Sequence, residues 1–120
     1  MQNIIIFTNN PRVVDAYRHV SRYYNSDVCS VFTAVRDAVH LGARIISHPL
    51  SGSVKPNESP YKSVAMSTTM GELDLKSLRV IEDAMATLKK LPVMNKSFAN
   101  AVLEDFQVID FELISNVMKI

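Results

Sequence analysis

Residues 3–11 read NIIIFTNNP, and this stretch decides the fold class. Its apolar part, residues 4–7, shows no alternation with polar residues, as is typical of a strand that is buried on both faces. Asn10 then precedes Pro11; asparagine is a preferred N-cap, and proline suits the first position of a helix. A buried strand that runs directly into a capped helix is the first half of a βαβ unit. The opening therefore predicts an α/β protein.

The same alternation continues into the middle of the chain. Residues 28–32 (VCSVF) predict a second strand. Thr33 then caps a predicted helix that stops at Gly42, because glycine most easily adopts a left-handed C-cap. Residues 45–46 form the centre of a third strand, and residues 62–67 predict a fourth.

A further helix is predicted to follow Asp74, which can cap it. Apolar residues recur along it at helical spacing: Leu75, Leu78, Ile81, Met85 and Leu88. Strands that alternate with helices predict a single domain over residues 1–120. We expect an α/β sandwich with a mainly parallel central sheet, layered as in Rossmann-like and flavodoxin-like folds.

Residues 97–119 fit two interpretations. The favoured one is a helix over residues 98–104, a strand over residues 106–109, and a helix capped by Asp110. The alternative is one continuous helix, because apolar residues recur every three or four positions: Phe98, Val102, Phe106, Ile109, Leu113 and Val117. A second apolar row is also present, formed by Val108, Phe111, Ile114 and Met118. A helix that is apolar on two faces covers one of them with a partner, so we expect a homodimer unless both rows are buried internally.

Composition excludes several classes of protein. The net charge is +1 and no Lys/Arg cluster is present, so the sequence does not predict binding to nucleic acid. Cys29 is the single cysteine and cannot form an internal disulfide, which fits a reducing, cytoplasmic location. The apolar run at residues 4–7 is too short for a signal sequence or a membrane span.

The candidate site is the long polar loop at residues 48–62, HPLSGSVKPNESPYK, which holds three of the five prolines. Loops of this length in compact domains are usually functional, although the prolines also fit a loop that merely closes the sheet. In parallel sheets, ligands bind beyond the carboxyl ends of the strands, where this loop and the turn after the first strand would converge. Lysines, hydroxyls, a glycine and a helix N-terminus predict a pocket for a small anion, with these ligand-binding residues: Asn9, Asn10, Ser51, Gly52, Ser53, Lys55, Asn57 and Lys62.

No established catalytic motif is present. The phosphate-binding patterns G-x-x-x-x-G-K-[ST] and G-x-G-x-x-G are absent, and Ser59 and Lys62 match S-x-x-K without its partner motifs. The three histidines and Cys29 lack metal-ligand spacing, so no metal and no cofactor are predicted. His48 opens the loop and is the candidate acid–base residue, the alternative being a hydrogen bond that orders the loop.

Three segments resemble the GrdX family: residues 48–63, the turn at residues 8–11, and residues 35–42 (VRDAVHLG). The resemblance extends from residue 3 to about residue 90 and is weak beyond Pro92. It implies a setting in glycine, sarcosine and betaine reductase systems, and it implies no mechanism. We therefore expect an accessory protein that binds a small anionic or phosphate-bearing metabolite through residues 48–62. The alternatives are a small enzyme using His48 or Lys55, and a docking subunit of a reductase complex.

Overall fold

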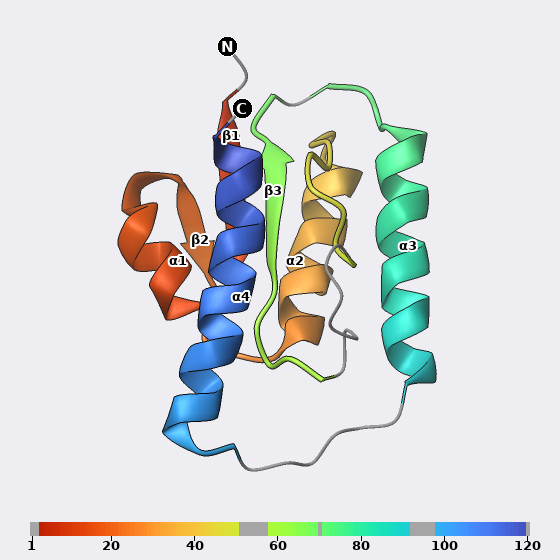
Figure 1. The fold of residues 1–120 in the computed structure, drawn as a ribbon. Coiled ribbons are helices and arrows are strands. Elements are labelled where there is room, and N and C mark those ends of the chain that lie inside the picture. The colour runs from red at the N-terminus through yellow and green to blue at the C-terminus, as the bar shows by residue number, and fades with distance from the viewer. Residues whose placement is uncertain (1–2, 51–57, 70, 92–97, 120) are drawn as a thin grey trace.

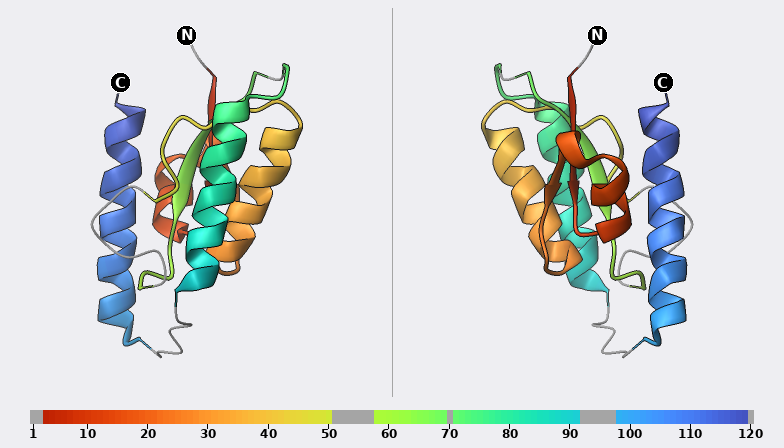
Figure 2. Two further views of the ribbon diagram at one scale, coloured as in Figure 1. Left: turned by 90° about the vertical axis from the view of Figure 1, so that its right-hand side faces the viewer. Right: turned by 90° about the vertical axis from the view of Figure 1, so that its left-hand side faces the viewer.

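The computed structural model describes residues 3–50, 58–69, 71–91 and 98–119. Three strands form a mixed sheet in the order β2-β1-β3. Central β1 (Ile4–Thr8) pairs in parallel with β2 (Ser21–Tyr23) and antiparallel with β3 (Ser63–Ser67). Helices cover both faces of this sheet, which gives three layers (Figures 1 and 2).

The helices divide evenly between the two faces. α2 (Val28–His40) and α3 (Leu75–Lys90) pack on one face, and α1 (Pro11–Ala16) and α4 (Asn100–Met118) pack on the other. A short 3-10 turn, η1 (Arg18–Val20), joins α1 to β2.

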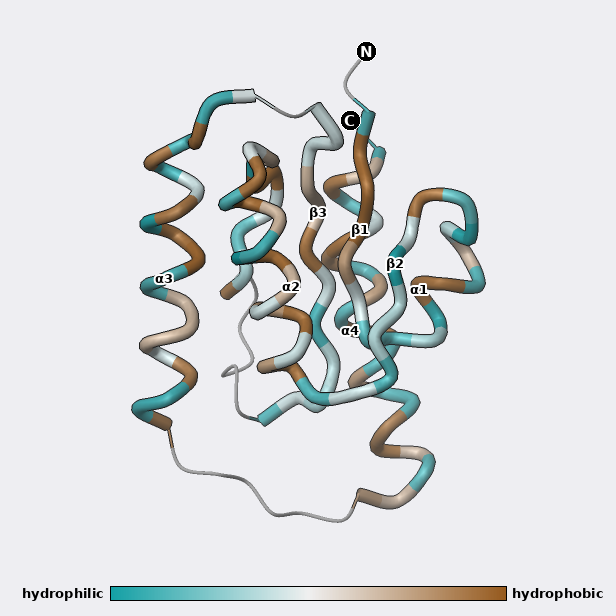
Figure 3. The backbone as a smooth tube through the Cα atoms, turned by 180° about the vertical axis from the view of Figure 1, so that it is seen from behind, coloured by the Kyte–Doolittle hydropathy of each residue, from teal (hydrophilic) through white to brown (hydrophobic). Residues whose placement is uncertain are grey.

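Alternation along the strands builds one hydrophobic cluster on each face. Phe7 of β1 packs in the cluster that contains Phe32 of α2, whereas its neighbour Ile6 packs with Ile114 of α4. Both strand residues are almost fully buried, at 2% and 0% exposure. The hydropathy-coloured tube shows the apolar residues of β1 at the centre of the molecule (Figure 3).

Several local predictions are confirmed. The opening strand is β1, and Asn10 caps α1 by accepting a hydrogen bond from the backbone nitrogen of Arg12 at 3.0 Å. Gly42 has a φ of 102° directly after α2, as expected of a left-handed C-cap. Asp74 caps α3 and accepts from the backbone nitrogen of Ser77 at 3.2 Å.

The prediction of a mainly parallel sheet is wrong. β3 runs antiparallel to β1, with Ser63 opposite Thr8. After α2 the chain first passes along β3 in the opposite direction at residues 45–46, and β3 is the return pass. The predicted third strand at residues 45–46 contributes only an isolated antiparallel bridge between Ile45 and Met66. The short parallel strand β2 was not predicted.

The predicted strand at residues 28–32 is also wrong, since these residues form the first turns of α2. Asp27 is the N-cap; its carboxylate accepts from the backbone nitrogen and the hydroxyl of Ser30, both at 2.9 Å. Thr33 therefore lies inside the helix instead of capping it. The apolar residues that pack in the core recur at helical spacing along α2: Val28, Val31, Phe32, Val35 and Val39.

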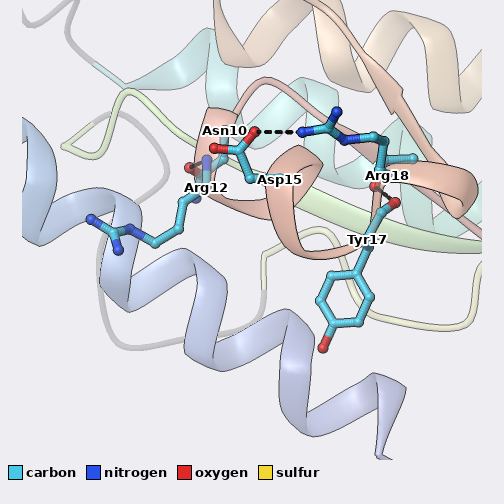
Figure 4. Close-up of polar contacts among 6 residues, drawn as sticks. Asn10, Arg12, Asp15, Tyr17 and Arg18 are labelled. Carbon is cyan, nitrogen blue, oxygen red and sulfur yellow. Dashed lines mark hydrogen bonds and ion pairs between the residues drawn. The ribbon is translucent and has the colours of Figure 1, made fainter.

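The favoured interpretation of the C-terminal segment is wrong, because residues 100–118 form one helix, α4, with Asp110 in its interior. Three residues of the second apolar row, Phe111, Ile114 and Met118, pack against the sheet. Tyr17 follows α1 and extends toward α4 (Figure 4). Its hydroxyl donates a hydrogen bond to the Ser115 hydroxyl at 3.1 Å. Among the described residues, no helix has the length and apolar character needed to cross a membrane.

Candidate functional site

Polar side chains are buried where β1 ends and β3 begins. Thr8, Asn9 and Asn10 follow one another at the end of β1 and are exposed by 0%, 4% and 0%. Ser63 starts β3 beside Thr8, and Asp110 enters from α4 with 7% exposure. Three elements that are distant in the sequence therefore meet in one buried polar cluster.

Asp110 is the acceptor at the centre of this cluster. Its Oδ1 accepts from the backbone nitrogen of Ser63 at 3.0 Å. Its Oδ2 accepts from the Ser63 hydroxyl at 2.7 Å and from Nδ2 of Asn10 at 3.0 Å. Buried carboxylates are tolerated when their oxygens are paired in this way.

The hydroxyls of Thr8 and Ser63 extend the cluster into the sheet. They lie 2.7 Å apart, and because the Ser63 hydroxyl donates to Oδ2 of Asp110, the Thr8 hydroxyl donates to Ser63. Thr8 Oγ1 in turn accepts from the backbone nitrogen of Asn10 at 2.9 Å. The result is a chain of donors directed toward the carboxylate, in which each hydrogen bond polarises the next.

Burial shifts both titratable groups of the cluster toward their neutral forms. It raises the pKa of Asp110, and the hydrogen bonds from Ser63 and Asn10 and the charge of Lys62 oppose that rise. It also lowers the pKa of Lys62, whose residue is 6% exposed, while the charge of Asp110 opposes the fall. The two charges are therefore desolvated together and partly compensate each other.

A cavity of about 10 Å³ adjoins the cluster. This space is about that of one water molecule, which is too small for a metabolite. Polar and apolar residues line it together: Ser47, Pro49, Lys62, Ser63, Asp110, Leu113, Ile114 and Val117.

The two asparagines predicted to bind a ligand make protein contacts here. Asn9 donates to the backbone oxygens of Ser26 and Pro60 at 2.9 and 2.8 Å, and its Oδ1 accepts from the backbone nitrogen of Lys62 at 2.9 Å. Asn10 also donates to the backbone oxygen of Gln107, at 2.9 Å. Their amide groups thus attach the end of the 48–62 loop and α4 to the end of β1.

The start of the loop is attached separately. The Ser47 hydroxyl accepts from the backbone nitrogen of Ala65 at 2.7 Å, and Pro49 is fully buried. His48 is exposed, and its Nδ1 accepts from the backbone nitrogen of Leu50 at 3.0 Å. This hydrogen bond favours the ordering role for His48 over the acid–base role.

The structure brings together Asn9, Asn10 and Lys62 from the predicted site. The other predicted ligand-binding residues lie outside the described part of the chain: Ser51, Gly52, Ser53, Lys55 and Asn57. Across residues 3–50, 58–69, 71–91 and 98–119, no group of three or more His, Cys, Asp or Glu side chains is placed to hold a metal ion.

Sequence reasoning missed the role of Asp110, which it treated as a helix cap. Thr8 and Ser63 were also missed as members of the cluster. A usable signal was present in the spacing, since Asp110 lies four residues before Ile114 and seven before Val117. In a single helix it shares their inward side. An acidic residue on the core side of a helix indicates a buried polar contact.

Comparisons with known proteins give a family and no further relatives. No curated protein and no solved structure matches the chain. The model of the GrdX-like protein family matches residues 5–119, which is nearly the whole sequence and includes the C-terminal helix. The chain therefore belongs to the GrdX-like protein family.

Proposed function

We propose that this protein is an accessory protein of glycine, sarcosine or betaine reductase systems that binds a small anionic ligand through the loop at residues 48–62. The reductase setting is what the family resemblance implies. The observation that supports binding is the firm attachment of both ends of this loop to the sheet and to the buried cluster.

The attachments at the two ends are made by different residues. At the start of the loop, the Ser47 hydroxyl is hydrogen-bonded to the backbone of β3, and Pro49 is fully buried. At the second end, Asn9 holds both the Pro60 carbonyl and the Lys62 backbone nitrogen. Binding residues typically lie on loops that a rigid scaffold positions, and fixed ends reduce the entropy lost when such a loop binds a ligand.

The buried cluster itself is poorly suited to hold an anion. Asn9 and Asn10 are engaged by protein partners, the cavity has room for about one water molecule, and Asp110 would repel a negative charge when ionised. We therefore assign ligand contact to the polar middle of the loop, with Lys55 as its cation, and a supporting role to Asn9, Asn10 and Lys62. Ser51, Gly52, Ser53 and Asn57 supply the remaining hydroxyl, backbone and amide donors.

A thermal-shift screen with inorganic phosphate, nucleotides, amino acids and short carboxylates tests the proposal. A ligand at a hundredfold excess over its Kd stabilises the folded state by about 2.7 kcal/mol. Lys55→Ala should weaken binding of the best ligand and leave unfolding in urea unchanged. Lys90→Ala, which removes an exposed lysine at the end of α3, is the matched control and should change neither.

Two outcomes would contradict the proposal. A screen without any stabilising anion would favour the alternative in which the protein is a docking subunit of a reductase complex. A Lys55→Ala variant that unfolds would show that Lys55 has a structural role.

A further inference from the structure

The outward side of α4 carries an exposed strip of alternating apolar and acidic residues, which we call the α4 strip: Val102, Asp105, Ile109 and Glu112. These residues are spaced by three, four and three positions, so they share one side of the helix. Val102 and Ile109 are 40% and 42% exposed. α4 is an outermost layer of the molecule, so this side faces away from the sheet (Figure 2).

The charge of α4 has a single sign. The helix contains four acidic residues and no lysine or arginine. The chain as a whole has 13 lysines and arginines against 12 acidic residues, so this helix is a local concentration of negative charge. Asp110 is buried, and Glu104, Asp105 and Glu112 are exposed.

A groove of about 560 Å³ between α1 and α4 adjoins the strip. Val108, which is 37% exposed, lines the groove together with Phe111 and Ala16. Asp15, Arg12 and Glu112 supply its charged groups, and Arg12 extends from α1 toward α4 (Figure 4). The apolar surface of the strip therefore continues into a concave region that has two acidic residues and one basic residue.

We propose that the α4 strip binds an amphipathic helix of another protein, one whose apolar stripe is flanked by lysine or arginine. The partner's apolar residues pack on Val102 and Ile109, and its basic residues pair with Asp105 and Glu112. Residues spaced by three and four positions form ridges that fit the grooves of a second helix. Helix recognition through such anchors is a recurrent binding mode. This proposal is independent of ligand binding by the 48–62 loop.

Charge argues for this partner over a second copy of the chain. Two α4 helices paired about a two-fold axis would bring Asp105 and Glu112 of each copy toward the acidic residues of the other. Like charges across an interface are unfavourable, whereas opposite charges steer association and select partners. The homodimer expected from the sequence stays a prediction.

Binding of two synthetic peptides to the full chain, measured by fluorescence anisotropy, tests the proposal. Both peptides are helical with leucine at the a and d positions; one has lysine at the flanking positions and the other has glutamate. The lysine peptide should bind at least about tenfold more tightly than the glutamate peptide. Ile109→Ser should weaken its binding, and the double variant Asp105→Lys/Glu112→Lys should reverse the preference.

The matched control is Glu82→Lys/Asp83→Lys, which makes the same change of charge at exposed positions of α3. It should leave the preference between the peptides intact. Failure of the lysine peptide to bind up to its solubility limit would overturn the proposal, as would an equal loss of binding in the control variant. Light scattering on the peptide-free protein tests whether a second copy occupies the α4 strip. A dimer that Ile109→Ser dissociates would show that it does and would also overturn the proposal.

Discussion

Asp110 accepts hydrogen bonds from both donor groups of Ser63, a residue 47 positions earlier in the chain. The backbone nitrogen of Ser63 donates at 3.0 Å and its hydroxyl at 2.7 Å. This pair of bonds fixes α4 against the start of β3, because sliding the helix by one residue would remove the acceptor from both donors. Apolar contacts alone tolerate such displacements more readily. We infer that the buried cluster specifies how the C-terminal helix docks.

Asp110→Ala should destabilise the protein by about 3–5 kcal/mol, the usual effect of removing one partner of a buried charged pair. The substitution leaves the donors of Ser63 and Asn10 without their acceptor and Lys62 without its opposite charge. Unfolding in urea measures the change. Glu112→Ala on the exposed side of the same helix is the control and should stay within about 0.5 kcal/mol of the wild type. Equal effects would show that the cluster contributes nothing specific.

The stability difference between the wild type and Asp110→Asn should depend on pH. Burial raises the pKa of Asp110 in the folded state above the unfolded value of roughly 3.9. As the pH rises through this window, the unfolded chain loses the proton first and is favoured. The free energy of unfolding of the wild type should therefore fall relative to that of the variant, and the difference should be constant above the folded pKa. Urea unfolding across a pH series measures it; a relative increase with pH would mean that the folded pKa is lowered.

The effects of Asp110→Asn and Lys62→Met on the free energy of unfolding should not be additive. Each single change leaves the other charge desolvated with less compensation, whereas the double variant contains neither charge. The double variant should therefore be more stable than the sum of the single effects predicts, by about 0.5–3 kcal/mol. The control cycle pairs Lys62→Met with Glu112→Gln and should be additive within about 0.5 kcal/mol. Additivity in both cycles would rule out coupling between Lys62 and Asp110.

Features determined by neighbouring residues were predictable from the sequence. The buried run before Asn10, the glycine after α2 and the cap at Asp74 each lie within a few residues of the element that they define. The prediction of a strand at residues 28–32 was wrong because the apolar residues there fit both a strand and a helix. Asp27 favours the helix because it caps it.

Features that depend on distant contacts were not predictable in this way. The direction of β3 depends on where the chain between α2 and β3 returns, and no local pattern encodes that path. The convergence of the loop with Asn9 and Asn10 was expected because strand ends meet in a parallel sheet. It occurs instead because β3 starts antiparallel beside the end of β1. Asp110 was misassigned because its role requires partners from β1 and β3.

Gly42→Ala should be strongly destabilising, and Gly71→Ala should not. Gly42 has a φ of 102°, and a Cβ there would meet the backbone of Gly71, whose nitrogen would lie 2.7 Å away. Left-handed geometry alone costs a non-glycine residue about 1–2 kcal/mol, and here the clash adds to it, because backbone atoms cannot move aside like a flexible side chain. A Cβ on Gly71 would meet nothing within 4 Å, so Gly71→Ala is the control: it adds a methyl group to the other glycine of this contact without creating a clash. It should change the urea midpoint little. If both variants lost stability equally, glycine would be required at position 71 as well, and the close approach of a Cβ at position 42 to the Gly71 backbone would not explain the loss.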